Sequence, residues 1–229
     1  MDRRQFSKTV VKTTLGAGLI MASPMGLYLD HGSRIRILGL AGSPRKQGNT
    51  DTLLSVLLKA AQEEGAETEK IYLKDHHVKP CVLCEQCHQN GQKSCVLKDD
   101  FQLVVEKMVA ADVIVISSPV HWIAVTTNVK LIMDRGYSLL KDSFKNVMVL
   151  GNSLLKGKIG AMVVCCNSKD IKTYAEPVAN SIHLFYKFLG IELAGTILAS
   201  AGFIEGEVTQ NEIAMNQAVE LGKKLAHSL

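Results

Sequence analysis

Four cysteines gather in one short polar stretch of the chain, "KPCVLCEQCHQNGQKSC", at residues 79–95. Cys81, Cys84 and Cys87 follow one another at gaps of two residues, and Cys95 comes after seven more. Three thiolates with such gaps can surround one face of an iron–sulfur cubane, and a fourth can close the cage, as in ferredoxin-type sites. The spacing is therefore typical of a cluster cage.

The spacing alone leaves two other uses of these thiols open. Structural zinc also takes four thiolates, although usually from two separated pairs. Two disulfides can form in an oxidising compartment, but a bridge across two residues closes a small strained loop and is usually redox-active. The other two cysteines, Cys165 and Cys166, are adjacent. We expect them to be buried thiols at the end of a core strand.

A second group of residues suited to chemistry is the loop "GSPRKQGNT" at 42–50, which is neither a Walker A loop nor the dinucleotide GxGxxG motif. Gly48 permits a tight turn, and the loop offers short polar side chains and positive charge. These are Ser43, Arg45, Lys46, Asn49 and Thr50. A helix follows and directs its free amide groups and positive dipole end at the loop. We expect a phosphate site here, and the alternative is a plain turn that caps a helix.

Strands and helices alternate through the rest of the chain and must position these groups. The expected strands are 34–40, 67–73, 112–119, 157–166 and 191–199. The expected helices are 49–66, 99–111 with Asp99 or Asp100 as its cap, about 123–140, 173–189 and 207–228. This order predicts an α/β fold, a flavodoxin-like doubly wound five-stranded parallel sheet. Ligands of such sheets bind beyond the carboxyl ends of the strands, at the switch between the first and third.

The chain has 229 residues, of which 47% are hydrophobic, and this suits a single domain at 32–229 with a cysteine-rich loop at 79–98. The net charge of +4 comes from scattered basic residues, so we expect no nucleic-acid partner. Residues 1–31 differ from the rest, because Arg3 and Arg4 precede a short apolar stretch at 13–22. That pattern predicts a twin-arginine export signal, and the alternative is a disordered basic tail of a cytoplasmic protein. No clear cleavage site follows, so the leader can remain as a membrane anchor.

The loop at 42–50, the cysteine loop and "SSPVHW" at 117–122 together resemble the NADPH-dependent FMN reductase and iron–sulfur flavoprotein group. The resemblance covers most of residues 35–200. It implies that the FMN phosphate is held by Ser43, Arg45, Gly48, Asn49 and Thr50. It further implies that the ribityl chain and isoalloxazine ring lie beside Ser118, Pro119, Val120, His121 and Trp122. His121 stands where the family more often has tyrosine.

The resemblance extends to two further regions. After the fourth strand, "CCNSKD" at 165–170 replaces the glycines of many relatives, and Asn167 and Ser168 can donate to the pyrimidine side of the flavin. By the match to the iron–sulfur flavoproteins, Cys81, Cys84, Cys87 and Cys95 bind one [4Fe–4S] cluster, although some relatives keep the cysteines without a cluster. Asp134 and Arg135, in a segment that also resembles the family, are interpreted as a weak ion pair on a helix surface.

These observations predict an FMN-dependent oxidoreductase that passes electrons between flavin and a [4Fe–4S] cluster, with the cofactors near each other. The implied partners are a redox protein or a small-molecule acceptor, with NAD(P)H as a further candidate, and a homo-oligomer is expected. The alternative is an NAD(P)H-dependent FMN or quinone reductase without a functional cluster. A third hypothesis, a binding module of flavodoxin shape without cofactor, is disfavoured by the intact loop at 42–50. Twin-arginine export carries folded proteins, so it is compatible with both cofactors and places the protein in the periplasm.

Overall fold

A computed structural model describes residues 34–89, 94–141 and 150–228. The predicted export leader lies outside these residues. The described chain contains five strands: β1 (Arg36–Ala41), β2 (Glu67–Tyr72), β3 (Val113–Pro119), β4 (Ile159–Cys166) and β5 (Glu192–Ser200). All neighbouring strands pair in parallel, in the order β2-β1-β3-β4-β5. The flavodoxin-like doubly wound sheet predicted from the sequence is therefore confirmed.

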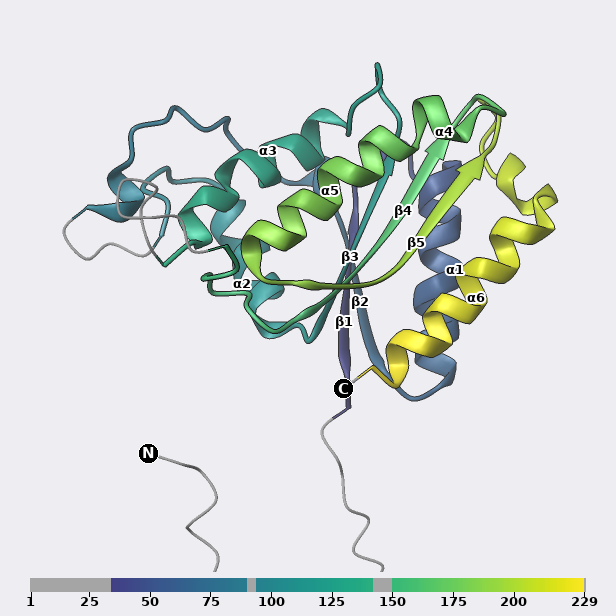
Figure 1. The fold of residues 1–229 in the computed structure, drawn as a ribbon, viewed down its shortest axis with the longest axis horizontal. Coiled ribbons are helices and arrows are strands. Elements are labelled where there is room, and N and C mark those ends of the chain that lie inside the picture. Colours follow the sequence, from purple (N-terminus) through teal and green to yellow (C-terminus); the bar gives the residue numbers. More distant parts are fainter. Residues whose placement is uncertain (1–33, 90–93, 142–149, 229) are drawn as a thin grey trace, which may run out of the picture. The chain divides into compact units, whose positions relative to one another are not determined.

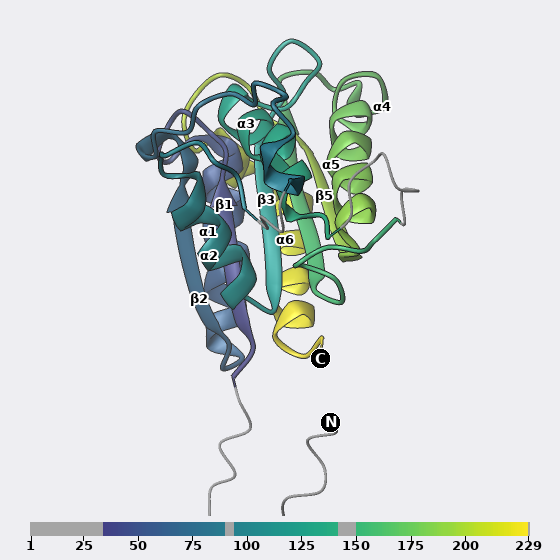
Figure 2. The same cartoon turned by 90° about the vertical axis from the view of Figure 1, so that its left-hand side faces the viewer.

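Helices cover both faces of this sheet (Figure 1). They are α1 (Asn49–Glu63), α2 (Phe101–Ala110), α3 (Thr127–Arg135), α4 (Ile171–Tyr174), α5 (Glu176–Leu189) and α6 (Glu212–Ala226). The helices α1 and α6 pack together over one face, and their apolar sides form one core with β1, β3 and β4. On the other face α2 lies over β1 and β2, and α5 lies over the β4–β5 half (Figure 2). The continuous apolar runs of the central strands are thus buried on both sides.

Three predicted helices begin later or break earlier than expected. The helix expected at 123–140 begins at Thr127, because Trp122 and Ile123 have φ angles of 52° and 59° and form a tight turn instead. The helix expected at 173–189 divides into α4 and α5, and a proline stands in the first turn of α5, where its missing N–H costs nothing. The last helix begins at Glu212, where the side chain of Asn211 caps it by accepting a hydrogen bond from the Ala214 N–H (3.1 Å).

One buried tyrosine joins α5 to the centre of the sheet. The Tyr186 hydroxyl accepts a hydrogen bond from the Ile116 N–H of β3 (3.1 Å). It lies 3.0 Å from the carbonyl oxygen of Ile114 and 2.8 Å from that of Ala161, so it donates across the boundary between β3 and β4. Gly160 leaves room for this ring, since a Cβ there would lie 2.8 Å from it.

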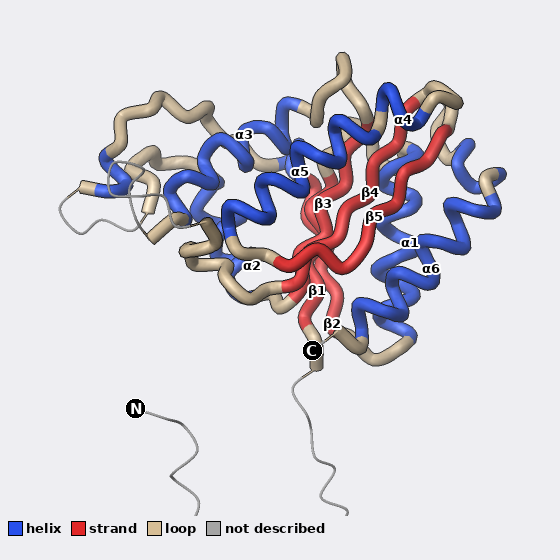
Figure 3. Tube along the Cα trace, in the orientation of Figure 1, coloured by secondary structure: helices blue, strands red, loops and turns tan. Residues whose placement is uncertain are grey.

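The stretch between β2 and α2 is a long excursion, mainly loop, that carries the four clustered cysteines (Figure 3). It contains two short 3₁₀ turns, Leu73–Asp75 and Gln86–His88. None of the helices in the described part of the chain combines the length and apolarity that a membrane crossing requires.

Candidate functional site

A cavity lies where β1, β3, β4 and β5 end, at the carboxyl edge of the sheet. It is lined by Ser43, Arg45, Asn49, Thr50, Pro119, Val120, His121, Cys165, Cys166, Asn167, Ala201, Gly202 and Phe203. Eight of these residues were predicted from the sequence, from three loops that are far apart along the chain. The predicted residues Gly48, Ser118, Trp122 and Ser168 are not part of the lining. The position is the one expected for a ligand at the topological switch point.

The loop at 42–50 turns tightly into α1 and brings the first amide groups of that helix to the cavity. The Ser43 hydroxyl donates to the Arg45 carbonyl (2.9 Å) and accepts from the Arg45 N–H (3.1 Å). Gly48 passes close to this turn, because a Cβ there would lie 3.1 Å from the Ser43 Oγ. The first N–H groups of α1 have no partner within the helix, and together with the helix dipole they suit a phosphate.

Two side chains of this loop reach across to the segment that follows β5. Asn49 donates from Nδ2 to the Gly202 carbonyl (2.9 Å) and accepts at Oδ1 from the Val208 N–H (3.0 Å). Arg45 donates from Nη1 to the Phe203 carbonyl (2.7 Å). The segment after β5 carries no sequence motif, so the sequence gives no sign that residues 201–203 line the cavity.

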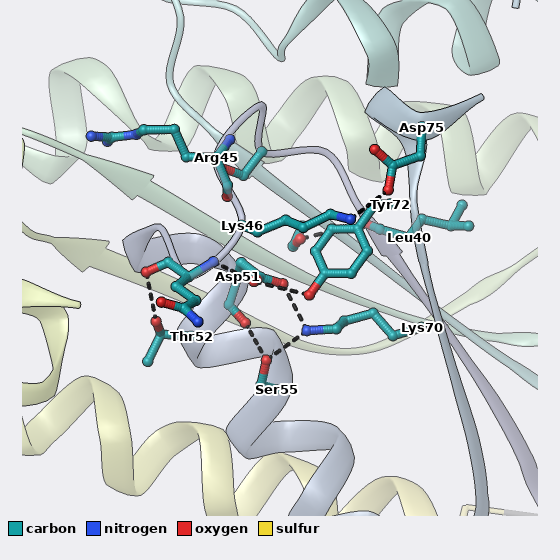
Figure 4. Close-up of polar contacts among 12 residues, drawn as sticks. Leu40, Arg45, Lys46, Asp51, Thr52, Ser55, Lys70, Tyr72 and Asp75 are labelled. Carbon is teal, nitrogen blue, oxygen red and sulfur yellow. Dashed lines mark hydrogen bonds and ion pairs between the residues drawn. The ribbon is translucent and has the colours of Figure 1, made fainter. Parts of the chain in front are cut away.

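A buried acid behind the loop fixes its shape (Figure 4). Asp51 accepts hydrogen bonds from the Gln47 N–H (2.8 Å), from the Lys70 Nζ (2.8 Å) and from the Tyr72 hydroxyl (3.3 Å). Gln47 has a φ of 65°, a left-handed conformation that is unfavourable for a residue with a side chain. Burial alone would lower the pKa of Lys70, but its hydrogen bond to Asp51 raises the pKa above its usual value. Asp51 therefore holds the loop against its own backbone strain.

Lys46 does not line the cavity, although the sequence suggested that its charge would serve a phosphate. Its Nζ lies 2.8 Å from a carboxylate oxygen of Asp75, at the end of β2, and 4.7 Å from the centre of the Tyr72 ring (Figure 4). The hydrogen bond to Asp75 raises the pKa of Lys46, and the same bond lowers the pKa of Asp75. Lys46 thus joins the loop at 42–50 to the beginning of the cysteine excursion.

The loop after β3 combines buried anchors with an exposed tip. The Ser118 Oγ accepts a hydrogen bond from the Thr126 N–H (3.0 Å), and the Thr126 hydroxyl donates to the Gly42 carbonyl (2.8 Å). His121 and Ala124 exchange two backbone hydrogen bonds around the turn at 122–123. Trp122 stands at the tip of that turn with 99% of its surface exposed. Ser118 therefore positions the loop, and Trp122 stands outside the cavity.

The two adjacent cysteines at the end of β4 are buried as predicted, and they also lie in the cavity wall, which the sequence does not indicate. Burial raises the pKa of the Cys165 thiol to about 12, despite a hydrogen bond with Thr50 that lowers it. The Cys166 Sγ lies 3.2 Å from the Ser168 carbonyl oxygen. The Ser168 hydroxyl accepts from the Asp170 N–H (3.1 Å), which shapes the turn before α4. Both residues line the cavity, and the raised pKa keeps the Cys165 thiol neutral.

The four clustered cysteines line a second cavity together. Its lining comprises Cys81, Val82, Leu83, Cys84, Glu85, Cys87, Cys95, Val96, Leu97, Arg135, Tyr137 and Ser138. All six cysteines of the chain are unpaired thiols in this structure. Burial, together with the neighbouring Cys95, Cys84 and Cys81 thiols, raises the pKa of Cys87 to about 11. Four thiols around one cavity are the donor set of a four-cysteine cluster. Within the described ranges, no three His, Cys, Asp or Glu side chains are arranged to hold a single metal ion.

A buried ion pair anchors the cysteine excursion at both ends. Asp99 and Arg135 bind each other with only 1% of each side chain exposed. Asp99 also accepts from the Lys79 N–H (2.8 Å) and from the Phe101 N–H (3.2 Å), and Asp100 accepts from the His77 N–H (2.7 Å). Burial would raise the pKa of Asp99. The hydrogen bonds that Asp99 itself accepts, led by that from Arg135, lower its pKa below the usual value.

The expectation that Arg135 forms a weak surface pair with Asp134 is therefore wrong. Asp134 pairs instead with Lys130, one helical turn earlier. Arg135 points into the protein because the partner that neutralises it, Asp99, is supplied by a distant loop. A sequence pattern along one helix contains no signal for such a contact.

The two cavities lie at opposite ends of α3. Residues 119–121, in the loop that leads to this helix, line the first cavity. Arg135, Tyr137 and Ser138, at and after its end, line the second. They share no lining residue in the described part of the chain. The cysteine excursion extends beside α3 (Figure 1), and the expectation that the two cofactors lie near each other stays a prediction.

Comparisons with known proteins identify the family of this chain. The sequence profile of the NADPH-dependent FMN reductase family matches residues 35–191. An iron–sulfur flavoprotein of Methanocaldococcus jannaschii is 32% identical over 199 residues, which cover 84% of this chain and 96% of that protein. An iron–sulfur flavoprotein of Methanosarcina thermophila is 29% identical over 195 residues, covering 85% and 95%. The solved NAD(P)H:quinone oxidoreductase of Methanothermobacter marburgensis has the same fold, with a TM-score of 0.61, 14% identity and coverage of 85% and 98%.

Proposed function

The chain belongs to the NADPH-dependent FMN reductase family and is a flavin-dependent oxidoreductase, and from that premise we propose that it passes electrons between FMN and a [4Fe–4S] cluster. The ligands of the cluster are Cys81, Cys84, Cys87 and Cys95. The observation that carries this proposal is that all four cysteines line one cavity, although seven to thirteen residues of chain separate Cys95 from the others. The iron–sulfur flavoproteins named above support it further.

The residues of the first cavity fit FMN. The amide groups at the start of α1, with Ser43 and Thr50, would hold the phosphate, and Arg45 would add positive charge at the mouth. Pro119, Val120, His121 and Asn167 would flank the ribityl chain and the ring. Bound FMN supplies two-electron and one-electron transfer, and a cluster supplies one-electron transfer. The chain itself positions the cofactors, and we assign no acid–base residue.

We propose further that the working unit is a homo-oligomer. The two cavities lie at opposite ends of α3, which has nine residues and is therefore about 13 Å long. Electron transfer slows steeply with distance, so a second copy that brings its cysteine excursion to the flavin cavity would shorten the path. The electron partner is a redox protein or a small-molecule acceptor.

Analysis of iron, sulfide and flavin in anaerobically prepared protein tests this function. We expect one FMN and about four irons with four sulfides per chain, and a yellow-brown colour. Cys87→Ser should lose iron and keep flavin, because Cys87 lies in the cysteine cavity alone. Cys166→Ser is the matched control and should keep its iron. Full iron in Cys87→Ser would refute the ligand assignment.

The second candidate is an NAD(P)H-dependent FMN or quinone reductase that uses only the first cavity. The observation in its favour is that the flavin cavity is complete without any residue of the cysteine excursion. A purely yellow protein without iron or sulfide that oxidises NAD(P)H with a quinone would establish it. A colourless protein that never takes up FMN would contradict both candidates.

Export through the twin-arginine route is a separate proposal for residues 1–31. Replacement of Arg3 and Arg4 by lysines tests it, because the protein should then remain in the cytoplasmic fraction. Equal distribution of both forms between fractions would contradict the proposal.

A further inference from the structure

A buried arginine stands in the wall of the cysteine cavity with part of its guanidinium unused. Arg135 is 2% exposed and is the only cationic side chain in the lining formed by described residues. Its Nη1 donates to Asp99 Oδ2 and to the Lys79 carbonyl (3.3 Å), and its guanidinium lies 4.1 Å from the centre of the Phe101 ring. Its Nε–H has no hydrogen-bond partner among the described residues.

An unpartnered N–H in the protein interior is rare and unfavourable, because water no longer satisfies it. In all the described residues, Arg135 Nε is the one fully buried side-chain nitrogen or oxygen without a partner. The residue that bears it also faces four thiols. The acceptor that is absent from the side chains around it is therefore to be sought among the contents of this cavity.

The chemistry of the cavity indicates the kind of acceptor. Four cysteines acting as thiolates with a sulfide-bridged cluster place negative charge on sulfur atoms, and sulfur accepts hydrogen bonds from buried donors. Asp99 neutralises the charge of Arg135 overall, but Arg135 lines the cavity and Asp99 does not. The pair therefore presents its positive end to the sulfur atoms.

We propose that Arg135 donates a hydrogen bond from Nε to a sulfur atom of the cysteine-held centre, and that its positive charge favours the reduced form of that centre. This inference rests on the proposed cluster. The cluster gains one electron on reduction and becomes more negative, so a fixed cation and an N–H donor at its edge raise its midpoint potential. Arg135 acts as a tuning residue and is not a ligand.

The test compares midpoint potential and iron content in three variants of the full chain. The double variant Asp99→Asn with Arg135→Gln removes both charges together, which avoids leaving one buried charge unpaired. Arg135→Lys keeps the charge and removes the Nε–H. Lys130→Gln, on the same helix with 57% of its side chain exposed, is the control for a charge change outside the cysteine cavity.

We expect the double variant to have a more negative midpoint potential than the wild type and to lose iron faster to a chelator. The midpoint potential and the rate of iron loss of Arg135→Lys should lie between those of the double variant and the wild type. Lys130→Gln should have the wild-type values. A double variant or an Arg135→Lys variant with wild-type potential and iron retention would overturn the inference while leaving the cluster in place. If the double variant does not fold, Arg135→Lys alone decides. Wild-type protein without iron and sulfide would overturn both the inference and the proposed function.

Discussion

Substitution of Asp51 by asparagine should weaken FMN binding although Asp51 does not line the flavin cavity. The side chain of Asp51 is 3% exposed and accepts hydrogen bonds from Lys70, Tyr72 and the backbone of Gln47. Asparagine preserves the shape but loses the charge, and its amide cannot accept from all three donors. The phosphate loop then loses the contact that holds Gln47 in its left-handed conformation.

The geometry gives the size of two effects, the loss of folding stability and the loss of FMN affinity. A hydrogen bond to a charged group contributes about 1.5–3 kcal/mol, so the free energy of unfolding should fall by about that amount. The left-handed conformation of Gln47 costs about 1–2 kcal/mol, which the free variant can relax and which FMN must then restore. At 1.4 kcal/mol for each factor of ten, the Kd for FMN should rise about 5- to 30-fold.

A double substitution separates the two effects. Glycine adopts the left-handed conformation without strain, so Asp51→Asn with Gln47→Gly should recover FMN affinity without recovering stability. The assays are equilibrium dialysis of FMN against cofactor-free protein and urea unfolding. Glu63→Gln, an exposed change at the other end of α1, should alter neither. An unchanged Kd in Asp51→Asn, or no recovery on adding Gln47→Gly, would refute the role assigned to the loop strain.

Three further predictions concern the core, the thiols and the buried ion pair. Tyr186→Phe leaves a β3 amide unpaired and should lower the free energy of unfolding by about 1–3 kcal/mol, whereas the same change at exposed Tyr174 should stay within about 0.5 kcal/mol in urea unfolding. Cys165, whose pKa burial raises to about 12, should resist iodoacetamide at pH 8 in folded cofactor-free protein while exposed Cys81 reacts, as mass spectrometry can follow. The folded pKa of Asp99 is below its usual 3.8, so its contribution to the free energy of unfolding should be present above about pH 4. That contribution should disappear as the pH falls through the folded pKa. Urea unfolding of Asp99→Asn at the same pH values should not show this loss in acid.

The sheet and the tight turn of the loop at 42–50 into a helix were predictable because their signals are local. The apolar run at 112–119 reports a strand buried on both faces, and the alternation of strands and helices leaves few parallel topologies. The loop at 42–50 combines glycine, short polar side chains and a helix start within nine residues. Each of these signals can be found without knowledge of any distant contact.

The features that the sequence did not reveal depend on contacts between distant segments. Arg135 is buried because Asp99 lies opposite it, and residues 201–203 enter the flavin cavity because Asn49 and Arg45 bind that segment. The turn at 122–123 uses left-handed backbone at tryptophan and isoleucine, whereas such turns usually have asparagine or glycine. Propensity therefore favoured helix at these positions, whereas two backbone hydrogen bonds between His121 and Ala124 close a tight turn.

The turn that follows β3 also gives the protein a built-in optical probe. Trp122 is the chain's single indole, and it stands in water at the rim of the flavin cavity. Its ultraviolet emission should therefore be red-shifted in the cofactor-free protein and quenched by energy transfer once the isoalloxazine ring, which absorbs in that region, occupies the adjacent cavity. Flavin loading can accordingly be followed in real time without any label or engineered chromophore.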